Sequence, residues 1–210
     1  LDIIRPLMKS QPNYRRVPVA SAAFSCFEDG VLNHLTIFPD LGRYCGTGHT
    51  ELVIASLKLL EKLSASPKLS FPPVMGFGRG SDRNRALAAL DDDGETISKI
   101  LLREMEVDID VNQGPESSAY IIQIHILDFL NSCLRAASGQ PTIAHLLLGF
   151  QCGLGGLSVE ADGSFSRGIS LFHTVLNLVL QAPIGDESGP VSWLVALNLK
   201  GMQVLKELWS

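Results

Sequence analysis

The sequence has few charged residues and no concentrated basic region. Only 19% of its 210 residues are charged, and 17 Lys and Arg are outnumbered by 22 Asp and Glu, for a formal net charge of −5. The basic residues gather locally only at Arg15–Arg16 and at Arg79, Arg83 and Arg85. Nucleic-acid-binding proteins gain most of their affinity by neutralising phosphates with a basic surface. The composition therefore argues against direct nucleic-acid binding.

Cysteine is scarce and widely spaced. The four cysteines are Cys26, Cys45, Cys133 and Cys152, and no C-x-x-C pair occurs. Disulfide frameworks belong to small secreted chains with a denser cysteine pattern. We expect reduced, mostly buried thiols in a nuclear or cytosolic protein.

A zinc site would have to be assembled from Cys26, His34, Cys45 and His49. Only Cys45 and His49 are closely spaced, whereas structural zinc sites normally combine two close pairs of ligands. Cys26 and His34 have aromatic and aliphatic neighbours, as in the core of a helix. We expect no metal site here.

The sequence also lacks recognisable catalytic and nucleotide-binding motifs. It contains no G-x-S-x-G, and no cysteine-protease signature surrounds Cys152. Gly76, Gly78 and Gly80 follow two prolines, do not match G-x-G-x-x-G in spacing, and have no Gly-Lys-Ser/Thr after them. We expect neither catalytic nor cofactor-binding residues.

Three histidines remain as candidates for a general base: His125, His145 and His173. Each lies in an apolar segment with helical periodicity. A single histidine in such a place is usually hydrogen-bonded core or groove lining. An all-α enzyme with a site around His145 and Cys152 is therefore the weakest hypothesis, and we expect His145→Leu to disturb a buried hydrogen bond without affecting any catalysis.

Long hydrophobic runs are missing as well. Residues 136–159 carry no formal charge, but Pro141, His145, Gln151 and several glycines interrupt them. A membrane-spanning helix needs about 20 predominantly apolar residues. TIAHLLLGFQCGLGGL at 142–157 is better interpreted as a short buried helix, which starts after Pro141 and stops at Gly149, followed by the exit loop CGLGGL.

Helical periodicity dominates the rest of the chain. Thr50 precedes ELVIASLKLLEKL as its expected N-cap, with Glu51 in the first turn. Ser81 and Asp82 begin DRNRALAAL, and the acidic turn Asp91–Asp93 precedes ETISKILLREM. Three further helices are AYIIQIHILDFLNSCLRAA, GISLFHTVLNLVLQA and the segment that starts at Gly189–Pro190. Strand patterns in SCFEDGVLNHLTIF and MEVDIDV are weak. The spacing predicts seven to nine helices of 10–20 residues joined by short breaks.

This succession predicts an all-α fold, an α-solenoid of divergent HEAT- or armadillo-like helix pairs, over residues 1–210. Residues 10–20 carry two prolines and two arginines with little periodicity, and we expect a loop or disordered insertion there. The chain starts at Leu1 without an initiator Met and ends within a helical pattern. We therefore expect an internal fragment of a longer superhelix.

One helix carries a family resemblance. TIAHLLLGF resembles a helix of the nucleoporin 192/205 family of inner-ring scaffold nucleoporins, in the pattern (N/T)-(L/I)-A-H-x-L-L-G-F. The matching positions are Ile143, Ala144, His145, Leu147, Leu148, Gly149 and Phe150. GHTELVIASLKLLEKLSASP at 48–67 is also similar to that family's helices, and the paralogous nucleoporin 188 family is a near alternative.

The resemblance implies a structural scaffold of the nuclear pore complex inner ring, located at the nuclear envelope and supporting nucleocytoplasmic transport. Such a segment would bind other nucleoporins, especially disordered linker nucleoporins, in grooves between helices, with no catalytic activity, no cofactor and no transmembrane segment. An extended partner offsets its ordering entropy through long, shallow contacts. The alternative is an all-α helical-repeat adaptor outside the pore.

Overall fold

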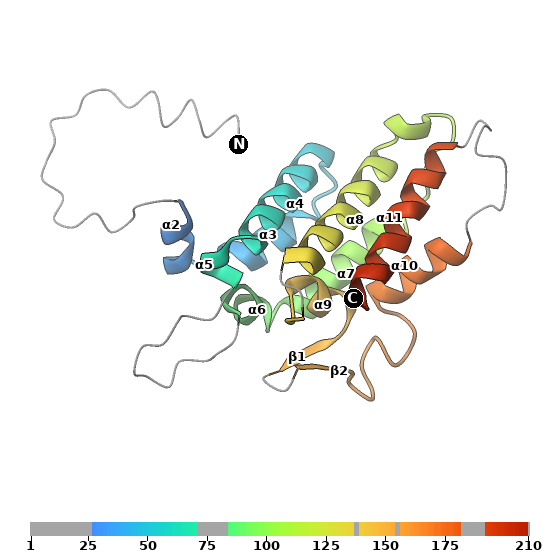
Figure 1. The fold of residues 1–210 in the computed structure, drawn as a ribbon. Coiled ribbons are helices and arrows are strands. Elements are labelled where there is room, and N and C mark those ends of the chain that lie inside the picture. Colours follow the sequence, from blue (N-terminus) through green and yellow to red (C-terminus); the bar gives the residue numbers. More distant parts are fainter. Residues whose placement is uncertain (1–26, 71–83, 137–138, 154–155, 182–191, 210) are drawn as a thin grey trace, which may run out of the picture.

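The computed structural model describes residues 27–70, 84–136, 139–153, 156–181 and 192–209. Over these ranges the chain forms ten α-helices, one 3-10 helix and one two-stranded sheet (Figure 1). The elements are α2 (Phe27–Asn33), α3 (Ile37–Tyr44), α4 (Thr50–Ser64), α5 (Pro67–Ser70), α6 (Arg85–Leu90), α7 (Gly94–Met105), η1 (Gly114–Glu116), α8 (Ser118–Ala136), α9 (Ile143–Leu148), β1 (Gln151–Gly153), β2 (Gly156–Ser158), α10 (Leu171–Leu180) and α11 (Ser192–Leu208).

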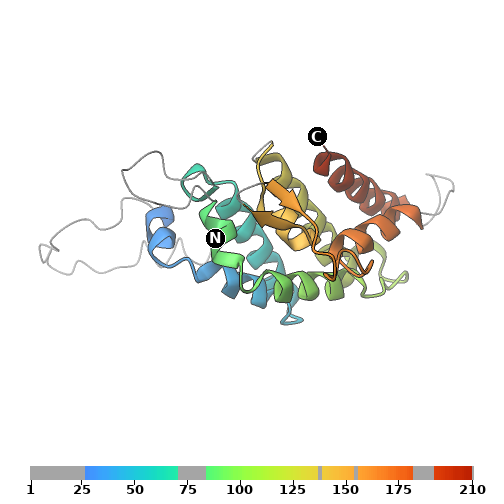
Figure 2. The same ribbon diagram turned by 90° about the horizontal axis from the view of Figure 1, so that it is seen from below.

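Six of the helices form three stacked pairs. Each pair has one helix in a first layer (α3, α7, α10) and one in a second layer (α4, α8, α11), and neighbouring helices pack against one another within and between the layers. Figure 2 shows the two layers side by side, with the colours running in the same direction through both. Stacked helix pairs of this kind are the unit of helical-repeat folds. The expected all-α helical-repeat fold is confirmed.

Helix α8 lies at the centre of the second layer because its apolar residues cover most of its circumference. Ile126, Leu127 and Leu130 are fully buried and belong to one continuous core cluster. A helix that is apolar on most sides must be covered on most sides, and α4, α7, α9 and α11 all pack against it. The expectation that other helices cover this segment is confirmed.

Helix α7 follows the expected amphipathic pattern. Ile97, Leu101 and Met105 are buried on one side, and the exposed Glu95 and Lys99 form an ion pair of 2.7 Å one turn apart. The periodic spacing of ETISKILLREM thus gives both the buried stripe and the surface pair.

Glycine allows the closest approach between α3 and α7. A Cβ atom added to Gly42 would lie 2.5 Å from Cδ1 of Ile97, well inside van der Waals contact. Gly42 and Ile97 are both buried in the first layer. The missing side chain therefore sets how closely these two helices pack.

The helix number and lengths differ from the sequence-based expectation of seven to nine helices of 10–20 residues. Within the described ranges there are ten α-helices, and five of them, α2, α3, α5, α6 and α9, are shorter than ten residues. Helices this short are marginal alone and depend on tertiary packing, which periodicity does not report.

Insertions of unequal length explain why no regular repeat is visible in the sequence. The first-layer helices begin at Ile37, Gly94 and Leu171, so successive pairs start at unequal distances. Helices α5 and α6 stand between the first and second pairs, and α9, β1 and β2 stand between the second and third. Similar pairs therefore stack without a fixed sequence period.

The expected exit loop CGLGGL is wrong in part, because residues on either side of 154–155 pair as a hairpin. Gln151 pairs with Ser158, Cys152 with Leu157 and Gly153 with Gly156, in antiparallel register. Gly149 does end α9, in the left-handed conformation at φ 106°. The strands contain little β-branched or alternating sequence, so local pattern did not predict them.

Several helix starts lie near, but not at, the predicted residues. His49 occupies the N-cap of α4, and Thr50 is its first helical residue. Asn84 caps α6 by accepting hydrogen bonds from the amides of Ala86 and Leu87. The Ser81–Asp82 start, the Gly189–Pro190 start and the loop expected at residues 10–20 lie outside the described residues.

In the parts that the structure describes, the two weak strand patterns form no strand. SCFEDGVLNHLTIF contributes helix α2 and the start of α3, and MEVDIDV is the end of α7 followed by irregular chain. Across the described ranges, no helix has the length and apolar character needed to cross a bilayer.

Candidate binding surface

Helix α9 begins with a hydrogen-bonded pair, Thr142 and His145. The backbone N–H of Thr142 donates to Nδ1 of His145 at 3.1 Å, and Thr142 Oγ1 lies 3.0 Å from the same nitrogen. His145 stands three residues after the N-cap, where Glu or Gln stands in a capping box. Because an amide N–H can only donate, Nδ1 is the acceptor and the ring proton lies on Nε2.

Burial keeps this histidine neutral. His145 is 8% exposed, and the loss of hydration lowers its pKa from the ordinary 6.5 to about 4. The residue is thus a hydrogen-bonded core histidine, as its apolar context predicts. It presents a neutral Nε2–H donor at physiological pH.

Helix α10 repeats the arrangement in a more exposed place. Ser170 stands at its N-cap, and Ser170 Oγ lies 2.9 Å from Nδ1 of His173, again three residues on. His173 is half-buried. The two helices therefore share an S/T-x-x-H start, buried at α9 and partly exposed at α10.

An aromatic cluster joins the hairpin side of the molecule to the third helix pair. The ring of Phe165 lies 4.7 Å from that of Phe150 and 5.0 Å from that of Phe172. Phe172 also contacts the exposed Trp209 at 5.8 Å. Aromatic pairs at these separations are stabilising beyond the area they bury. The cluster fixes the chain after β2 against α10 and the end of α11.

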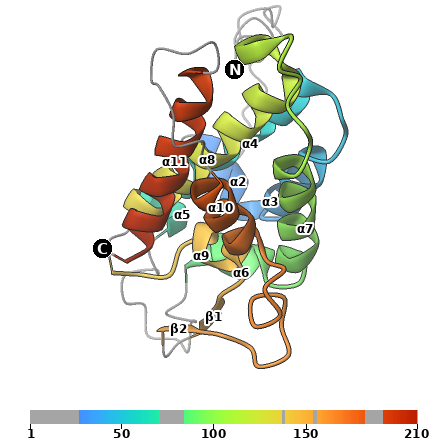
Figure 3. The same cartoon turned by 90° about the vertical axis from the view of Figure 1, so that its right-hand side faces the viewer.

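A pocket of about 410 Å³ lies between the end of α8, the turn into α9, strand β2 and the end of α11. Its walls include the apolar side chains of Leu134, Leu157 and Leu208, and His145 borders it. Figures 1 and 3 show α9 and the hairpin at the same end of the molecule as the last turn of α11. Segments distant in sequence thus form one concave site.

The outer face of the second layer carries polar pairs that join its helices. Ser132 Oγ on α8 donates to Glu61 on α4 at 3.0 Å, and Arg135 on α8 forms a 3.0 Å ion pair with Glu207 on α11. Asp128 and Lys200 form a further α8–α11 ion pair. Pairs of this kind match neighbouring helices to one another, although exposed ion pairs add little stability.

Among the described residues, the candidate zinc ligands are not grouped as a metal site would need. Cys45 is fully buried, donates to the carbonyl of Leu41, and has a pKa raised to about 12 by burial and by Glu104. His49 is exposed, and Cys26 lies outside the described residues. His34 is exposed rather than in a helix core, so that expectation is wrong: α2 ends one residue earlier.

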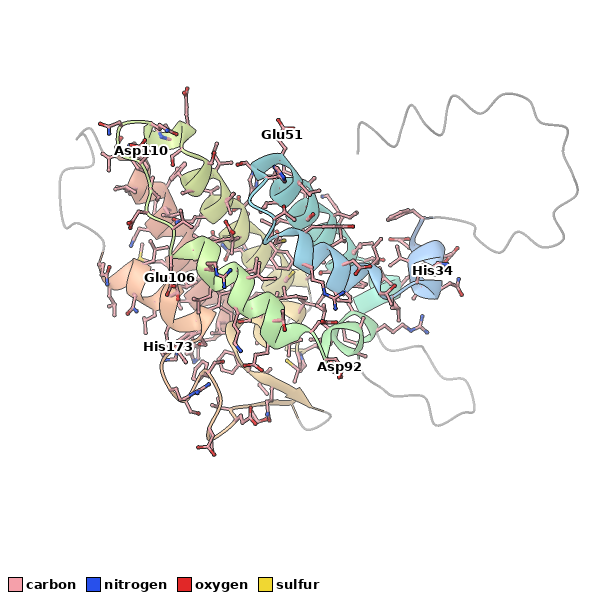
Figure 4. All side chains as sticks on the ribbon, turned by 180° about the vertical axis from the view of Figure 1, so that it is seen from behind. His34, Glu51, Asp92, Glu106, Asp110 and His173 are labelled. Atoms are coloured by element: carbon pink, nitrogen blue, oxygen red, sulfur yellow. The ribbon has the colours of Figure 1, made fainter. Side chains whose placement is uncertain are left out.

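The other titratable candidates are also dispersed. Figure 4 shows His34 beside α2, Asp92 at the turn between α6 and α7, and His173 on α10, at separate places. In the described ranges, no three His, Cys, Asp or Glu side chains are grouped as a metal site would need. Asp93 of the acidic turn instead forms a 2.7 Å ion pair with Arg43.

The remaining histidine and thiols do not converge on a reaction centre either. Burial, followed by the charge of Lys58, lowers the pKa of His125 on α8. Burial raises the pKa of Cys133 to about 12. Cys152 is buried on β1. The candidate glycines Gly76, Gly78 and Gly80 lie outside the described residues.

Sequence reasoning missed most of the pocket. Arg135, Leu157 and Glu207 carry no local motif, because the pocket arises from three segments that the fold brings together. One local signal was present: the capping template S/T-x-x-E/Q, with His allowed at its last position, matches both TIAH and SLFH.

The stacked helix pairs define an all-α helical-repeat protein with a concave site between an insertion and the last helix. Residues 1–210 match the family described as "Nuclear pore complex scaffold, nucleoporins 186/192/205". The chain is also 41% identical over 215 residues to Nucleoporin NUP192 of Chaetomium thermophilum. The aligned region includes all of this chain and 12% of the length of that relative.

The chain therefore belongs to the family of nuclear pore complex scaffold nucleoporins 186/192/205. The resemblance carried by TIAHLLLGF pointed to this family and is confirmed. The family is structural, and its members are nucleoporins of the pore in the nuclear envelope.

Proposed function

We propose that this chain is a structural module of the nuclear pore inner ring that binds extended segments of linker nucleoporins and thereby supports nucleocytoplasmic transport. The observation that carries the proposal is the family match over the whole of residues 1–210. The three stacked helix pairs support it, because stacked repeats offer long surfaces to extended partners. Residues 1–210 act as one solenoid segment in this proposal.

A binding assay tests this function. The purified chain is mixed with immobilised segments of each inner-ring linker nucleoporin, and unrelated disordered segments of matched length and charge serve as controls. Capture by at least one linker and by no control is the expected result. Failure to bind any inner-ring linker, with the helical circular dichroism spectrum intact, would contradict the proposal.

We further propose that the chain performs no catalysis. Cys152 is 4% exposed on β1, and a reactive catalytic thiol needs both access and a lowered pKa. We expect Cys152 to react with a thiol reagent far more slowly in the folded chain than after denaturation, as mass spectrometry would show. Rapid labelling of this thiol at neutral pH would instead support the enzyme hypothesis.

An adaptor role outside the pore is not favoured, since the whole chain matches a pore scaffold family. A fluorescent fusion of the protein separates the two roles in cells. The scaffold role predicts a rim at the nuclear envelope, and exclusive cytoplasmic or vesicular signal would favour the adaptor.

A further inference from the structure

Within the described part of the chain, one ring nitrogen of His145, Nε2, has no hydrogen-bond partner. Nδ1 of His145 is occupied by Thr142, which leaves Nε2–H as the free donor of the ring. No hydrogen bond to Nε2 is present within the described ranges, and the ring borders the pocket while only 8% exposed. A ring N–H that borders an open cavity and has no partner in the described ranges is suited to an acceptor from outside the chain.

The outer edge of strand β2, next to the pocket, faces no other strand within the described ranges. In an antiparallel pair of strands, residue pairs that share hydrogen bonds alternate with pairs that do not. Two residues separate Gly153 from Gly156, so this closing pair is a hydrogen-bonded one, and the next pair, Cys152 and Leu157, is not. The N–H and C=O of Leu157 therefore point away from β1. No other strand pairs with β2 in the described part of the chain, and Gly156 and Leu157 line the pocket.

The charges at the pocket favour an uncharged occupant. Arg135 and Glu207 are the charged residues that line it, and they form a 3.0 Å ion pair with each other. The walls are otherwise largely apolar, with Leu134, Leu157 and Leu208 among them. A ligand carboxylate would have to compete with Glu207 for Arg135, and a ligand cation would have to compete with Arg135 for Glu207.

The size of the pocket limits the occupant further. A volume of about 410 Å³ lies near the lower end of the range of roughly 300–1,000 Å³ for ligand pockets. It accommodates one large side chain and the backbone beside it. A whole helix is too wide, since its diameter with side chains is about 10–12 Å.

We propose that this pocket binds an extended, uncharged peptide segment of a partner protein. One large apolar side chain of the segment enters between Leu134, Leu157 and Leu208, a backbone carbonyl accepts the Nε2–H of His145, and the peptide backbone pairs with the outer edge of β2. This is strand addition, in which main-chain hydrogen bonds give affinity and a side-chain pocket gives specificity. The inference rests on the proposed function and assigns its binding site.

The probe is an end-blocked peptide of about nine residues, made of Thr and Gln with a single central Leu. Two further peptides replace the central Leu with Asp or methylate the backbone nitrogens beside it. Titration into the isotope-labelled chain, followed by amide chemical shifts, reports affinity and location together. We expect binding of the Leu peptide alone, with shifts confined to residues around His145 and 156–158.

Matched variants test the His145 hydrogen bond and the pairing with the edge of β2 one at a time. His145→Gln keeps an acceptor for the Thr142 amide and a donor toward the pocket, so it should bind within about threefold of the wild type, whereas His145→Leu should weaken binding by about tenfold. Leu157→Pro removes an edge N–H that the hairpin does not use and should weaken binding similarly. Thermal melting of each variant confirms that it is folded.

Several results would overturn the pocket assignment. Equal binding of the Leu and Asp peptides, equal affinity of His145→Gln and His145→Leu, or shifts confined to the faces of α4 and α11 would each do so. A dimer in sedimentation whose interface excludes the peptide would show that a second copy fills the site. Linker segments that bind the wild type and both weakened variants equally would overturn this site while leaving the proposed function intact.

Discussion

The second helix layer and the insertion that precedes the third pair differ in how their polar groups are paired. In the layer formed by α4, α8 and α11, polar side chains such as Ser132 and Asp128 pair with the next helix. The amide of Asn131 on α8 also donates to the carbonyl of Lys200 on α11, and within the described ranges its Oδ1 is the buried acceptor of α8 without a partner. In the insert, defined as α9, β1 and β2, His145 has a hydrogen-bond partner at only one ring nitrogen within the described ranges. The outer edge of β2 pairs with no other strand in the same ranges.

This difference indicates a division of roles. Groups that pair between helices contribute to the stacking that maintains the scaffold, whereas an unpaired donor and an unpaired strand edge are suited to a partner. The fully buried core of α8 should make the larger contribution to the free energy of unfolding, and the insert should determine peptide binding.

The largest effect is expected in the layer. Leu130 on α8 is fully buried, so Leu130→Ala should lower the free energy of unfolding by about 2–5 kcal/mol through lost burial and a cavity. Leu157 in the insert is 45% exposed, and Leu157→Ala should change stability by no more than about 0.5 kcal/mol. Urea denaturation followed by circular dichroism measures the free energy of unfolding of both variants. Similar losses of stability in the two variants would contradict the difference between the layer and the insert.

A pH-dependent loss of stability should come from the insert. His145 has a folded pKa of about 4 and an ordinary value of 6.5. Between these pH values the unfolded chain binds a proton at this histidine that the folded chain does not. The contribution of His145 to the free energy of unfolding is therefore fully present above pH 6.5 and falls by up to about 3 kcal/mol toward pH 4.

The matched variants are His145→Gln and His173→Gln, since both histidines occupy the same capping position and only His145 is buried. His145→Gln should flatten the fall in stability over this pH range, and His173→Gln should retain it. Urea midpoints at several pH values provide the measurement. An unchanged slope in His145→Gln would show that this histidine is not the buried neutral group described above.

The smallest of the three effects is expected at the contact between α3 and α7. Gly42→Ala places a Cβ 2.5 Å from Ile97, so overpacking should cost about 1–3 kcal/mol. Because the contact belongs to the helix layers, peptide affinity of the folded chain should not change. In a double-mutant cycle with Ile97→Ala the two losses should not add, and full additivity would contradict the close approach.

The helix layers could largely be predicted from the sequence, and the insert could be predicted only in part. The 3.6-residue spacing of Ile97, Leu101 and Met105 predicted α7 and its buried side. The apolar run between Pro141 and Gly149 predicted α9 and its end, because proline and glycine mark helix boundaries. Local apolar spacing is sufficient where a helix buries one continuous stripe.

The hairpin and the pocket depend on contacts that local spacing does not contain. Strands β1 and β2 have three residues each, and their pairing is supported by burial of Cys152 rather than by strand-forming residues. Arg135 and Glu207 meet only because α8 and α11 pack side by side. The sequence therefore predicted the scaffold class and its family, but not the surface proposed to bind the partner.

Hydrogen exchange with and without a bound linker nucleoporin segment tests the division between layer and insert most directly. Amides exchange by local opening, so a bound partner slows exchange where it is bound. We expect slowed exchange in α9 and at residues 156–158, with little change in α4 and along most of α8. Protection confined to α4 and α8, with none at the insert, would contradict it.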